Sequence, residues 1–489
     1  MQENKHDLTT PPEERTLVRG IKSWHVSLIA LGGIIGSCYF LGSGYTVAEV
    51  GPGAAFAYAI GGLIIYSVMM SFAELLVNIP RRGSFVSYSS EFLGPSISCG
   101  VGWAYWANWV AYCPAEALAC GILMNLFVPW SAFYWAIIFM GLITLINIYH
   151  VTWFGHIESI LALIKIAAVI IFSILALGII LGIIGGKPIV LDILLNNGET
   201  TIYEALFPFG GFVVLTTMTM ILVNFQGSEI VGLAAAETEN PEHNIPKACK
   251  AVTYRIIGIY VIPLFLLVMI LPYAEAGLED SVFSIALAKY GFNWAAGLFS
   301  VVTMIAAFSC ANSGVFGTVR CLYGLSTEGL APKVFLRLNR FHVPQLATIF
   351  TITPMWFVLA LGYFLPESNL YAYLLSMSGF TGTICWMAII AAQMVMRKRM
   401  KERGYDVEKE LSVKTPMYPA LPIVGFLLMT FGLLFLAWQP DLRPVLWFAV
   451  PSVVVPSIIY KILAKQGKVR GVKLHDDEVA FDIKFPVKK

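Results

Sequence analysis

The sequence predicts an all-α integral membrane protein with twelve transmembrane helices. Of its 489 residues, 58% are hydrophobic and only 13% are charged, and the mean hydropathy is +0.75. This composition is far too apolar for a soluble protein of this size. Apolar stretches long enough to cross roughly 30 Å of hydrocarbon, at about 20 residues each, recur twelve times. They lie near residues 24–48, 54–78, 98–127, 131–149, 157–184, 208–236, 251–274, 294–320, 345–365, 369–396, 417–438 and 444–463.

Lysine and arginine residues predict the orientation of these spans. Of the 32, 28 fall in connections on the side of the amino terminus, and one lies within a span. The other three, Lys187, Lys289 and Arg443, fall in connections on the opposite side. Because cytoplasmic loops are enriched in basic residues, both termini are expected in the cytoplasm, with the chain in the plasma membrane. Residues 1–22 lack the apolar core of a signal peptide, so we interpret 1–22 and 465–489 as cytoplasmic tails.

The basic residues are interpreted as orientation signals, so the expected partner is the lipid bilayer and no nucleic acid is expected. The eight cysteines lie in or beside membrane segments, and none lies in an outer loop. No disulfide framework is therefore predicted. No oligomeric state is predicted.

The first span contains the glycine-rich stretch Gly32 to Gly44, which reads GGIIGSCYFLGSG. Each glycine weakens a helix by roughly 1 kcal/mol relative to alanine. At membrane depth an irregular backbone is tolerated only where it lines a cavity or binds something. We therefore interpret the stretch as a helix break that forms a binding site. The alternative is that these glycines only allow neighbouring helices to pack closely.

The sixth span is interrupted in the same way, at residues 224–229, which read NFQGSE. Broken helices in first and sixth position suggest two inverted five-helix repeats, residues 23–205 and 206–400, followed by two peripheral helices in 401–464. Such pairs of broken helices mark the substrate site of secondary transporters, because their ends present free N–H groups to an anion and free carbonyls to a cation. A zwitterion satisfies both.

Two ionisable residues lie deep inside predicted spans. Glu116 is about 18 residues into the third span, where a carboxylate costs roughly 2.5–3.5 kcal/mol on insertion scales and is expected to face a cavity or a partner. A neutral acid hydrogen-bonded between helices would need no function.

Lys165 lies nine residues beyond His156 in the fifth span, roughly 13 Å into the helix. Its long side chain could extend to the surface. We favour a functional role, because burial disfavours the charged form of an amine. An amine that exchanges its proton could couple transport to a proton gradient.

An enzymatic function is not expected. The sequence contains neither the HExxH metal-binding motif nor the phosphate-binding loop GxxxxGK[ST]. No metal and no cofactor are predicted, and the proton is the expected coupling ion.

The chain resembles the amino acid–polyamine–organocation permeases, within their amino acid transporter branch. The resemblance covers about residues 15 to 460, with motifs in matching order. These motifs are GGIIGSCYFLGSG, FAELLVNIPRRGSFVSY, GWAYWANWV, ALIKIAAVIIF, NFQGSEIVGLAAAETENPEHNIPKA and SCANSGVFGTVRCLYGLSTEGLAPKVF. It implies ten core helices in two inverted repeats, two peripheral helices, and amino acid uptake that is mostly proton-coupled.

The resemblance also implies site residues. The backbone at Gly36, Ser37 and Cys38 would hold the substrate carboxylate, and Phe225 would act as a gate. The resemblance would place Lys165 between the first and eighth helices, with Ser309 and Asn312 near it. Lys165 and Glu116, both singled out above by their depth in a span, are the predicted proton-coupling residues. Carbonyls near Ile34, Ile35 and Phe225 would receive the amino group, and the predicted substrate-binding residues are Ile34, Ile35, Gly36, Ser37, Cys38, Phe225, Gln226, Gly227 and Glu229.

One position departs from the family pattern. Relatives usually have glycine where this chain has Cys38, and an aliphatic residue where it has Tyr39. We expect Cys38 to alter the pocket and to be reachable from the substrate path. Glu229 is weak evidence for a cationic substrate. An exchanger, a sodium-coupled symporter and, less favoured, an amino acid receptor with a transporter fold remain alternatives to proton symport.

Overall fold

The computed structural model describes residues 35–81, 84–149, 152–184, 201–233, 249, 256–277, 280–339, 343–364, 367–438, 440, 442–469 and 478–487. Helices, turns and irregular segments make up these ranges, and no β-strand occurs within them. The predicted all-helical class is therefore confirmed. The amino-terminal tail 1–22 and Ile34 lie outside the described residues.

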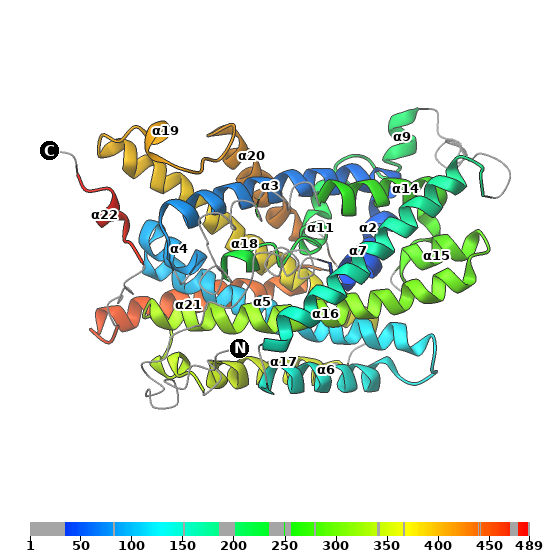
Figure 1. Cartoon of the computed structure of the whole chain (residues 1–489), viewed down its shortest axis with the longest axis horizontal. Coiled ribbons are helices and arrows are strands. Elements are labelled where there is room, and N and C mark those ends of the chain that lie inside the picture. Colours follow the sequence, from blue (N-terminus) through cyan, green and yellow to red (C-terminus); the bar gives the residue numbers. More distant parts are fainter. Residues whose placement is uncertain are drawn as a thin grey trace.

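Long helices dominate the fold and run side by side along its longest axis (Figure 1). Within the described part of the chain, five helical runs are long and apolar enough to cross a membrane, and four shorter apolar helices accompany them. The predicted count of twelve spans and the inverted repeat remain predictions. The main helices are α3 (Ala54–Asn78), α5 (Pro95–Asn125), α6 (Ala132–Tyr149), α7 (Thr152–Ile180), α14 (Ile262–Ile270), α16 (Asn293–Thr327), α17 (Gln345–Leu361), α18 (Glu367–Glu402), α20 (Ala420–Leu436) and α21 (Leu446–Lys465).

Helix α5 lies at the centre and packs against α6, α16, α18 and α21. In the apolar window of α18, 78% of the residues are buried, whereas the corresponding value for α21 is 11%. The outward face of α7 carries exposed isoleucine and leucine side chains, and that of α21 carries Trp447 and Phe448 together with exposed valine, isoleucine and leucine. Apolar side chains of this kind suit contact with lipid tails. Lipid tails are as apolar as these side chains, so the side chains gain no hydrophobic stabilisation by packing against protein instead.

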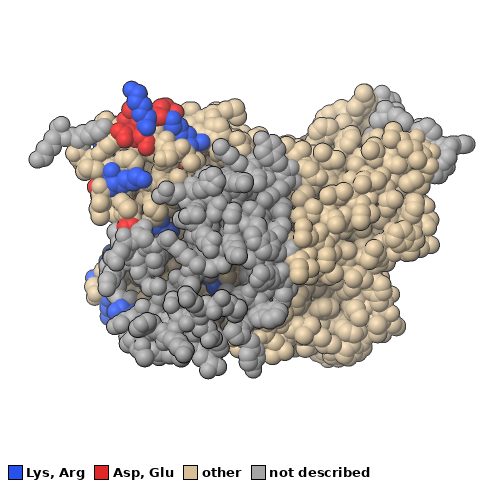
Figure 2. Space-filling model, viewed as in Figure 1, with Lys and Arg blue, Asp and Glu red and all other residues tan. Residues whose placement is uncertain are grey.

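The charged side chains visible in Figure 2 lie toward one end of the molecule, and the largest group of them lies near α19 (Val407–Glu410). At this end a buried ion pair joins α3 to α18. Arg397 donates to Glu74 from Nε at 2.6 Å and from Nη2 at 2.7 Å, and both side chains are almost fully buried. The Glu74 carboxylate also accepts from Gln393 Nε2 at 2.9 Å and from the Thr415 N–H at 2.6 Å. Such bidentate, fully bonded pairs tolerate burial.

The two predicted helix breaks differ in form. In the first span Ile35 and Gly36 are not helical, and they precede the π-helix η2 (Cys38–Gly42) and the helix α2 (Ser43–Val50). In the sixth span α11 (Met218–Val223) ends before a turn that covers residues 224–229, and α12 (Ile230–Leu233) follows. The predicted interruption of the sixth span is confirmed.

Candidate substrate site at the two helix breaks

The break in the first span is buried at the centre of the fold. A Cβ atom added at Gly36 would lie 2.4 Å from Glu116 Oε1 and 2.9 Å from both Cys310 Sγ and Tyr112 OH. No side chain fits at these distances without displacing its neighbours. Three polar atoms from α5 and α16 thus converge on the backbone at Gly36, which explains why glycine stands there.

The Glu116 carboxylate binds the backbone at this break. Both of its oxygens accept from the Ser37 N–H, at 3.2 Å and 3.0 Å, and the side chain is fully buried. The resemblance assigned the N–H groups of Gly36, Ser37 and Cys38 to a substrate carboxylate. An internal carboxylate therefore occupies one of the positions predicted for the substrate.

Lys165 binds the other side of the same break. Its Nζ donates to the Ile35 carbonyl at 3.0 Å, and the side chain is fully buried, so it does not extend to the surface. The Ile35 carbonyl was among those predicted to receive the substrate amino group. Glu116 and Lys165 thus place one acid and one ammonium at the two backbone groups where a zwitterion is expected to bind.

Two tyrosines complete the contacts around the break. Tyr371 OH lies 2.9 Å from Ser37 Oγ, and Tyr112 OH lies 2.9 Å from Cys38 Sγ. Sequence reasoning missed both. Nothing distinguishes Tyr371 among the 21 tyrosines of the chain, and the signal for Tyr112 is only its spacing of four residues from Glu116. Cys38 itself is fully buried, and no disulfide joins any two cysteines within the described residues.

Glu229 stabilises the break in the sixth span. Gly227 has a φ of 99°, which favours glycine, and its N–H is 3.2 Å from both Glu229 oxygens. The carboxylate also accepts from Tyr105 OH at 3.0 Å and from Trp386 Nε1 at 3.1 Å. These contacts engage both oxygens of Glu229 with the protein itself, whereas a cationic substrate was the predicted partner.

The predicted gate, Phe225, is fully buried beside the break. Its ring centroid is 4.9 Å from that of Tyr260 and 6.0 Å from that of Tyr58. A Cβ atom added at Gly61 would lie 2.9 Å from the same ring. The ring is therefore tightly packed, in a closed arrangement.

Gln226 joins the sixth span to α18 and α5. Its Nε2 donates to the Ser378 carbonyl at 2.7 Å, and Ser378 Oγ lies 2.7 Å from the side-chain oxygens of both Gln226 and Asn108. Asn108 Nδ2 is buried and has no hydrogen-bond partner among the described residues. Asn108 was not predicted as a site residue, although Asn, Tyr and Glu at 108, 112 and 116 share one face of α5 at intervals of four residues.

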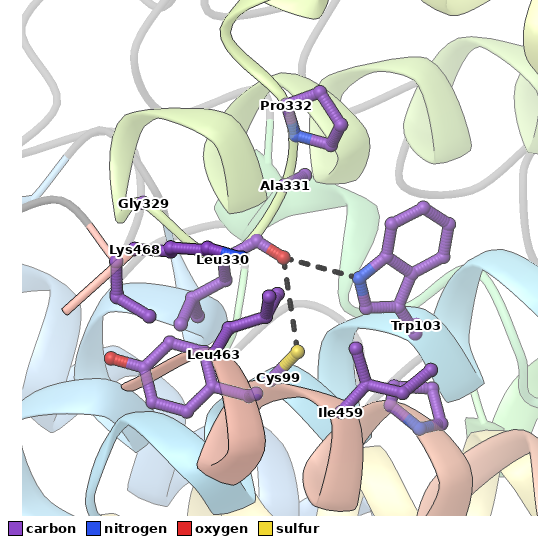
Figure 3. Close-up of a pocket in the computed structure, with 12 residues that line it drawn as sticks. Cys99, Trp103, Gly329, Leu330, Ala331, Pro332, Ile459, Leu463 and Lys468 are labelled. Carbon is purple, nitrogen blue, oxygen red and sulfur yellow. Dashed lines mark hydrogen bonds between the residues drawn. The ribbon is translucent and has the colours of Figure 1, made fainter. Parts of the chain in front are cut away.

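The remaining predicted residues lie on α16. Ser309 and Asn312 are both buried, and Asn312 Oδ1 accepts from Asn147 Nδ2 of α6 at 2.7 Å. A separate groove of about 500 Å³ lies between the start of α5, the loop after α16 and α21 (Figure 3). There the Leu330 carbonyl accepts from Trp103 Nε1 at 3.2 Å. The groove contains none of the predicted site residues.

Comparisons with known proteins show the family of the chain. A family model described as amino acid permease matches residues 25–469. The chain is 36% identical over 452 residues to the amino-acid permease RocC of Bacillus subtilis, and the aligned region covers 92% of this chain and 95% of RocC. It is 33% identical over 432 residues to the lysine-specific permease LysP of Escherichia coli, with 86% of each chain covered. It is 30% identical over 452 residues to the gamma-aminobutyric acid permease of Bacillus subtilis, with coverage of 92% and 94%.

These relatives are transporters rather than enzymes, and the matches span most of each chain. The family model covers most of the chain, and the chain has long apolar helices. The chain therefore belongs to the amino acid permease family of multi-pass membrane proteins.

Proposed function

We propose that this permease takes up an amino acid together with a proton across the plasma membrane, by alternating access, with both termini in the cytoplasm. The observation that carries the proposal is the pair of internal charges at the first break. Glu116 accepts from the Ser37 N–H, and Lys165 donates to the Ile35 carbonyl. A bound amino acid would need these same backbone groups.

The carboxylate supplies the coupling step. An ionised Glu116 competes with the substrate carboxylate for the Ser37 N–H and repels it. Once protonated, Glu116 is a much weaker acceptor and carries no charge, so the N–H becomes available to the substrate. Binding of the amino acid and binding of a proton thereby favour one another, which is the thermodynamic requirement for symport.

The lysine has a complementary role. An ammonium at the Ile35 carbonyl stands where a coupling cation or the substrate amino group would bind, so it disfavours sodium coupling. Lys165 also ties α7 to the broken first span. Loss of its proton would weaken this contact and let the first span move relative to α7.

The side chain of the substrate is proposed to be polar. LysP and the gamma-aminobutyric acid permease are named for substrates that carry an additional amine or lack an α-amino group, so names within the family do not fix one substrate. In this chain the unpartnered Asn108 amide, beside Gln226 and Ser378, offers a hydrogen bond to such a side chain. A buried polar group without a partner is costly unless a ligand supplies one.

Exchange of amino acids is the second candidate, because the same site would serve it. Uptake of labelled amino acids into proteoliposomes, in sodium-free buffer with and without an inward proton gradient, separates the two. Symport predicts accumulation that depends on the gradient. Rapid exchange with preloaded amino acid, but no net uptake under a gradient, would refute proton symport and support exchange.

A further inference from the structure

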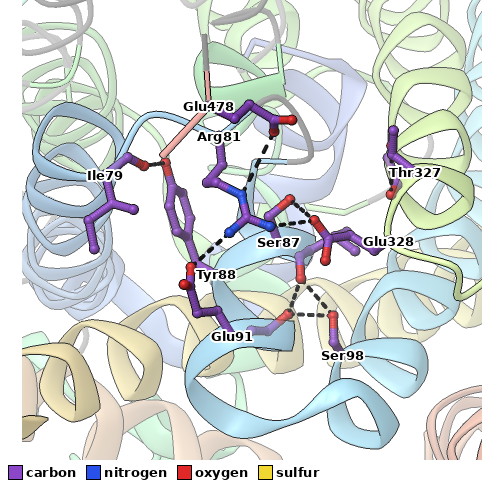
Figure 4. A network of polar contacts seen from close by, with 12 residues as sticks. Ile79, Arg81, Ser87, Tyr88, Glu91, Ser98, Thr327, Glu328 and Glu478 are labelled. Carbon is purple, nitrogen blue, oxygen red and sulfur yellow. Dashed lines mark hydrogen bonds and ion pairs between the residues drawn. The ribbon is translucent and has the colours of Figure 1, made fainter. Parts of the chain in front are cut away.

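A buried cluster of charges closes the end of the molecule where α3 and α16 finish (Figure 4). Arg81 donates from Nη1 to Glu91 Oε2 at 2.9 Å and from Nη2 to Glu328 Oε1 at 2.9 Å, and its Nε lies 3.7 Å from Glu478 Oε1. The exposed fraction of these four side chains is between 3% and 15%. One guanidinium therefore meets carboxylates from three separate parts of the chain.

This cluster connects the two predicted repeats. Arg81 belongs to the first repeat, as does Glu91, which lies on α4 (Phe85–Leu93). Glu328 follows α16 in the second repeat. Burial raises the pKa of the Glu91 carboxyl above its ordinary value, and the Arg81 guanidinium only partly opposes this effect. Glu478 reaches Arg81 from the C-terminal segment, so this segment takes part directly in the cluster. Further contacts from the same segment hold it at this end.

The C-terminal strap, residues 478–487, supplies these contacts. Its Val479 N–H donates to the Pro80 carbonyl at 3.3 Å, and its Phe481 N–H donates to Glu91 Oε1 at 2.7 Å. The Phe481 ring is fully buried, with its centroid 5.3 Å from that of Phe92. The strap therefore binds the end of α3 and the helix α4 directly beside the charge cluster.

The strap also binds the region after α18. Arg403 donates to Asp482 Oδ1 and to the Phe485 carbonyl, each at 2.6 Å, and Tyr405 OH donates to the Pro486 carbonyl at 2.8 Å. Asp482 is itself 77% exposed. The strap thus ties the end of α3 and the helix α4 to the residues that follow α18, and Phe481 and Phe485 are its buried side chains.

We infer that the C-terminal strap is an autoinhibitory latch, which docks on the ends of α3, α4 and α18 and holds this end of the transporter closed. The inference rests on the proposed alternating access, because a latch of this kind matters only if this end opens. Undocking of the strap removes Glu478 from Arg81 and the Phe481 N–H from Glu91. The ties that the strap makes between α3 and α4 on one side and the residues after α18 on the other are then lost, and this end can open.

The test uses the full chain with Phe481→Ala, and Ile483→Ala as the matched control. Ile483 lies in the same short helix, α22 (Phe481–Lys484), but is 71% exposed. Arg403→Gln is a second variant, which weakens the other side of the strap. Two quantities are measured in membrane vesicles: hydrogen exchange of the strap amides, and peptide-resolved alkylation of Cys38 by an impermeant maleimide added on the side of the strap.

The expected result is faster exchange of the strap amides and alkylation of Cys38 increased about tenfold or more in Phe481→Ala and Arg403→Gln, since removal of a buried phenylalanine destabilises its site strongly. Ile483→Ala should match the parent protein. If the strap amides exchange faster but Cys38 alkylation stays at the parent rate, the strap is not a latch. If neither variant frees the strap, the docking contacts described above do not hold it. Failure of amino acid uptake in the parent protein would overturn the proposed function instead, because alkylation of Cys38 requires no transport.

Discussion

Glu116→Gln separates the role of the charge from that of the side-chain shape at the first break. The glutamine keeps the size of Glu116 and its oxygen can still accept from the Ser37 N–H, which lies 3.0–3.2 Å from the carboxylate. A hydrogen bond to a charged group contributes about 1.5–3 kcal/mol and a neutral one about 0.5–1.5 kcal/mol. Displacing the neutral amide therefore costs a substrate carboxylate about 1–1.5 kcal/mol less than displacing the ionised Glu116. The Kd of Glu116→Gln should accordingly be lower than that of the ionised parent protein by roughly five- to tenfold.

The difference in Kd between the parent protein and Glu116→Gln depends on pH. In the parent protein we expect the Kd for the amino acid to rise as the pH increases and Glu116 ionises. In Glu116→Gln the Kd should stay low and independent of pH, because position 116 can no longer ionise. Accumulation driven by a proton gradient should be lost, while exchange of labelled for unlabelled amino acid should continue.

The assay is equilibrium binding of the labelled substrate to purified protein across a pH series on both sides of neutrality, together with proteoliposome uptake. Glu402→Gln is the control, since Glu402 is 59% exposed at the end of α18 and pairs only loosely with Lys398, at 3.9 Å. A Kd that keeps the pH dependence of the parent protein in Glu116→Gln, or full gradient-driven accumulation in that variant, would show that Glu116 does not couple the proton.

Three further predictions concern other contacts. Lys165→Ala should still bind substrate but lose accumulation driven by a pH gradient, because the Ile35 carbonyl loses its ammonium; full accumulation in proteoliposomes would contradict this. Glu74→Ala should destabilise the protein by about 3–5 kcal/mol, since it removes the buried partner of Arg397, and thermal unfolding in detergent should show a lower Tm than in the double variant Glu74→Leu with Arg397→Met. A small thiol reagent should block transport through Cys38, and substrate should slow the reaction; if Cys38→Ser is equally sensitive, another cysteine is responsible.

The sequence was informative where the physics of the bilayer leaves few options. Glycines and polar groups inside an apolar span can only mark a break or a close contact, and so the turn at residues 224–229 was predictable. A buried acid was predicted to face a cavity or a partner, and Glu116 contacts the Ser37 N–H. For Lys165 the sequence left extension to the surface open, and the side chain instead contacts the Ile35 carbonyl. The sequence could not predict that both partners are backbone groups of one break, because this depends on how α5 and α7 pack against the first span.

Other contacts gave little or no local signal. Tyr371 and Tyr112 are two of many aromatic residues, and only the packing brings their hydroxyls to Ser37 and Cys38. The same holds for the Arg81 cluster, whose carboxylates are separated from it by up to several hundred residues. Long-range polar contacts of this kind follow from tertiary structure and not from local pattern.

In the proposed mechanism, helix α5 links substrate selectivity to proton coupling. Glu116 contacts the break in the first span, Tyr112 contacts Cys38, and Asn108 contacts the residues beside the break in the sixth span. These three positions span eight residues, or roughly 12 Å along the helix. A substrate whose carboxylate binds near Ser37 would extend its side chain along this same face. A shift of α5 that accompanies protonation of Glu116 would therefore also move Asn108, so substrates that contact Asn108 should be coupled more tightly to the proton than substrates too short to reach it.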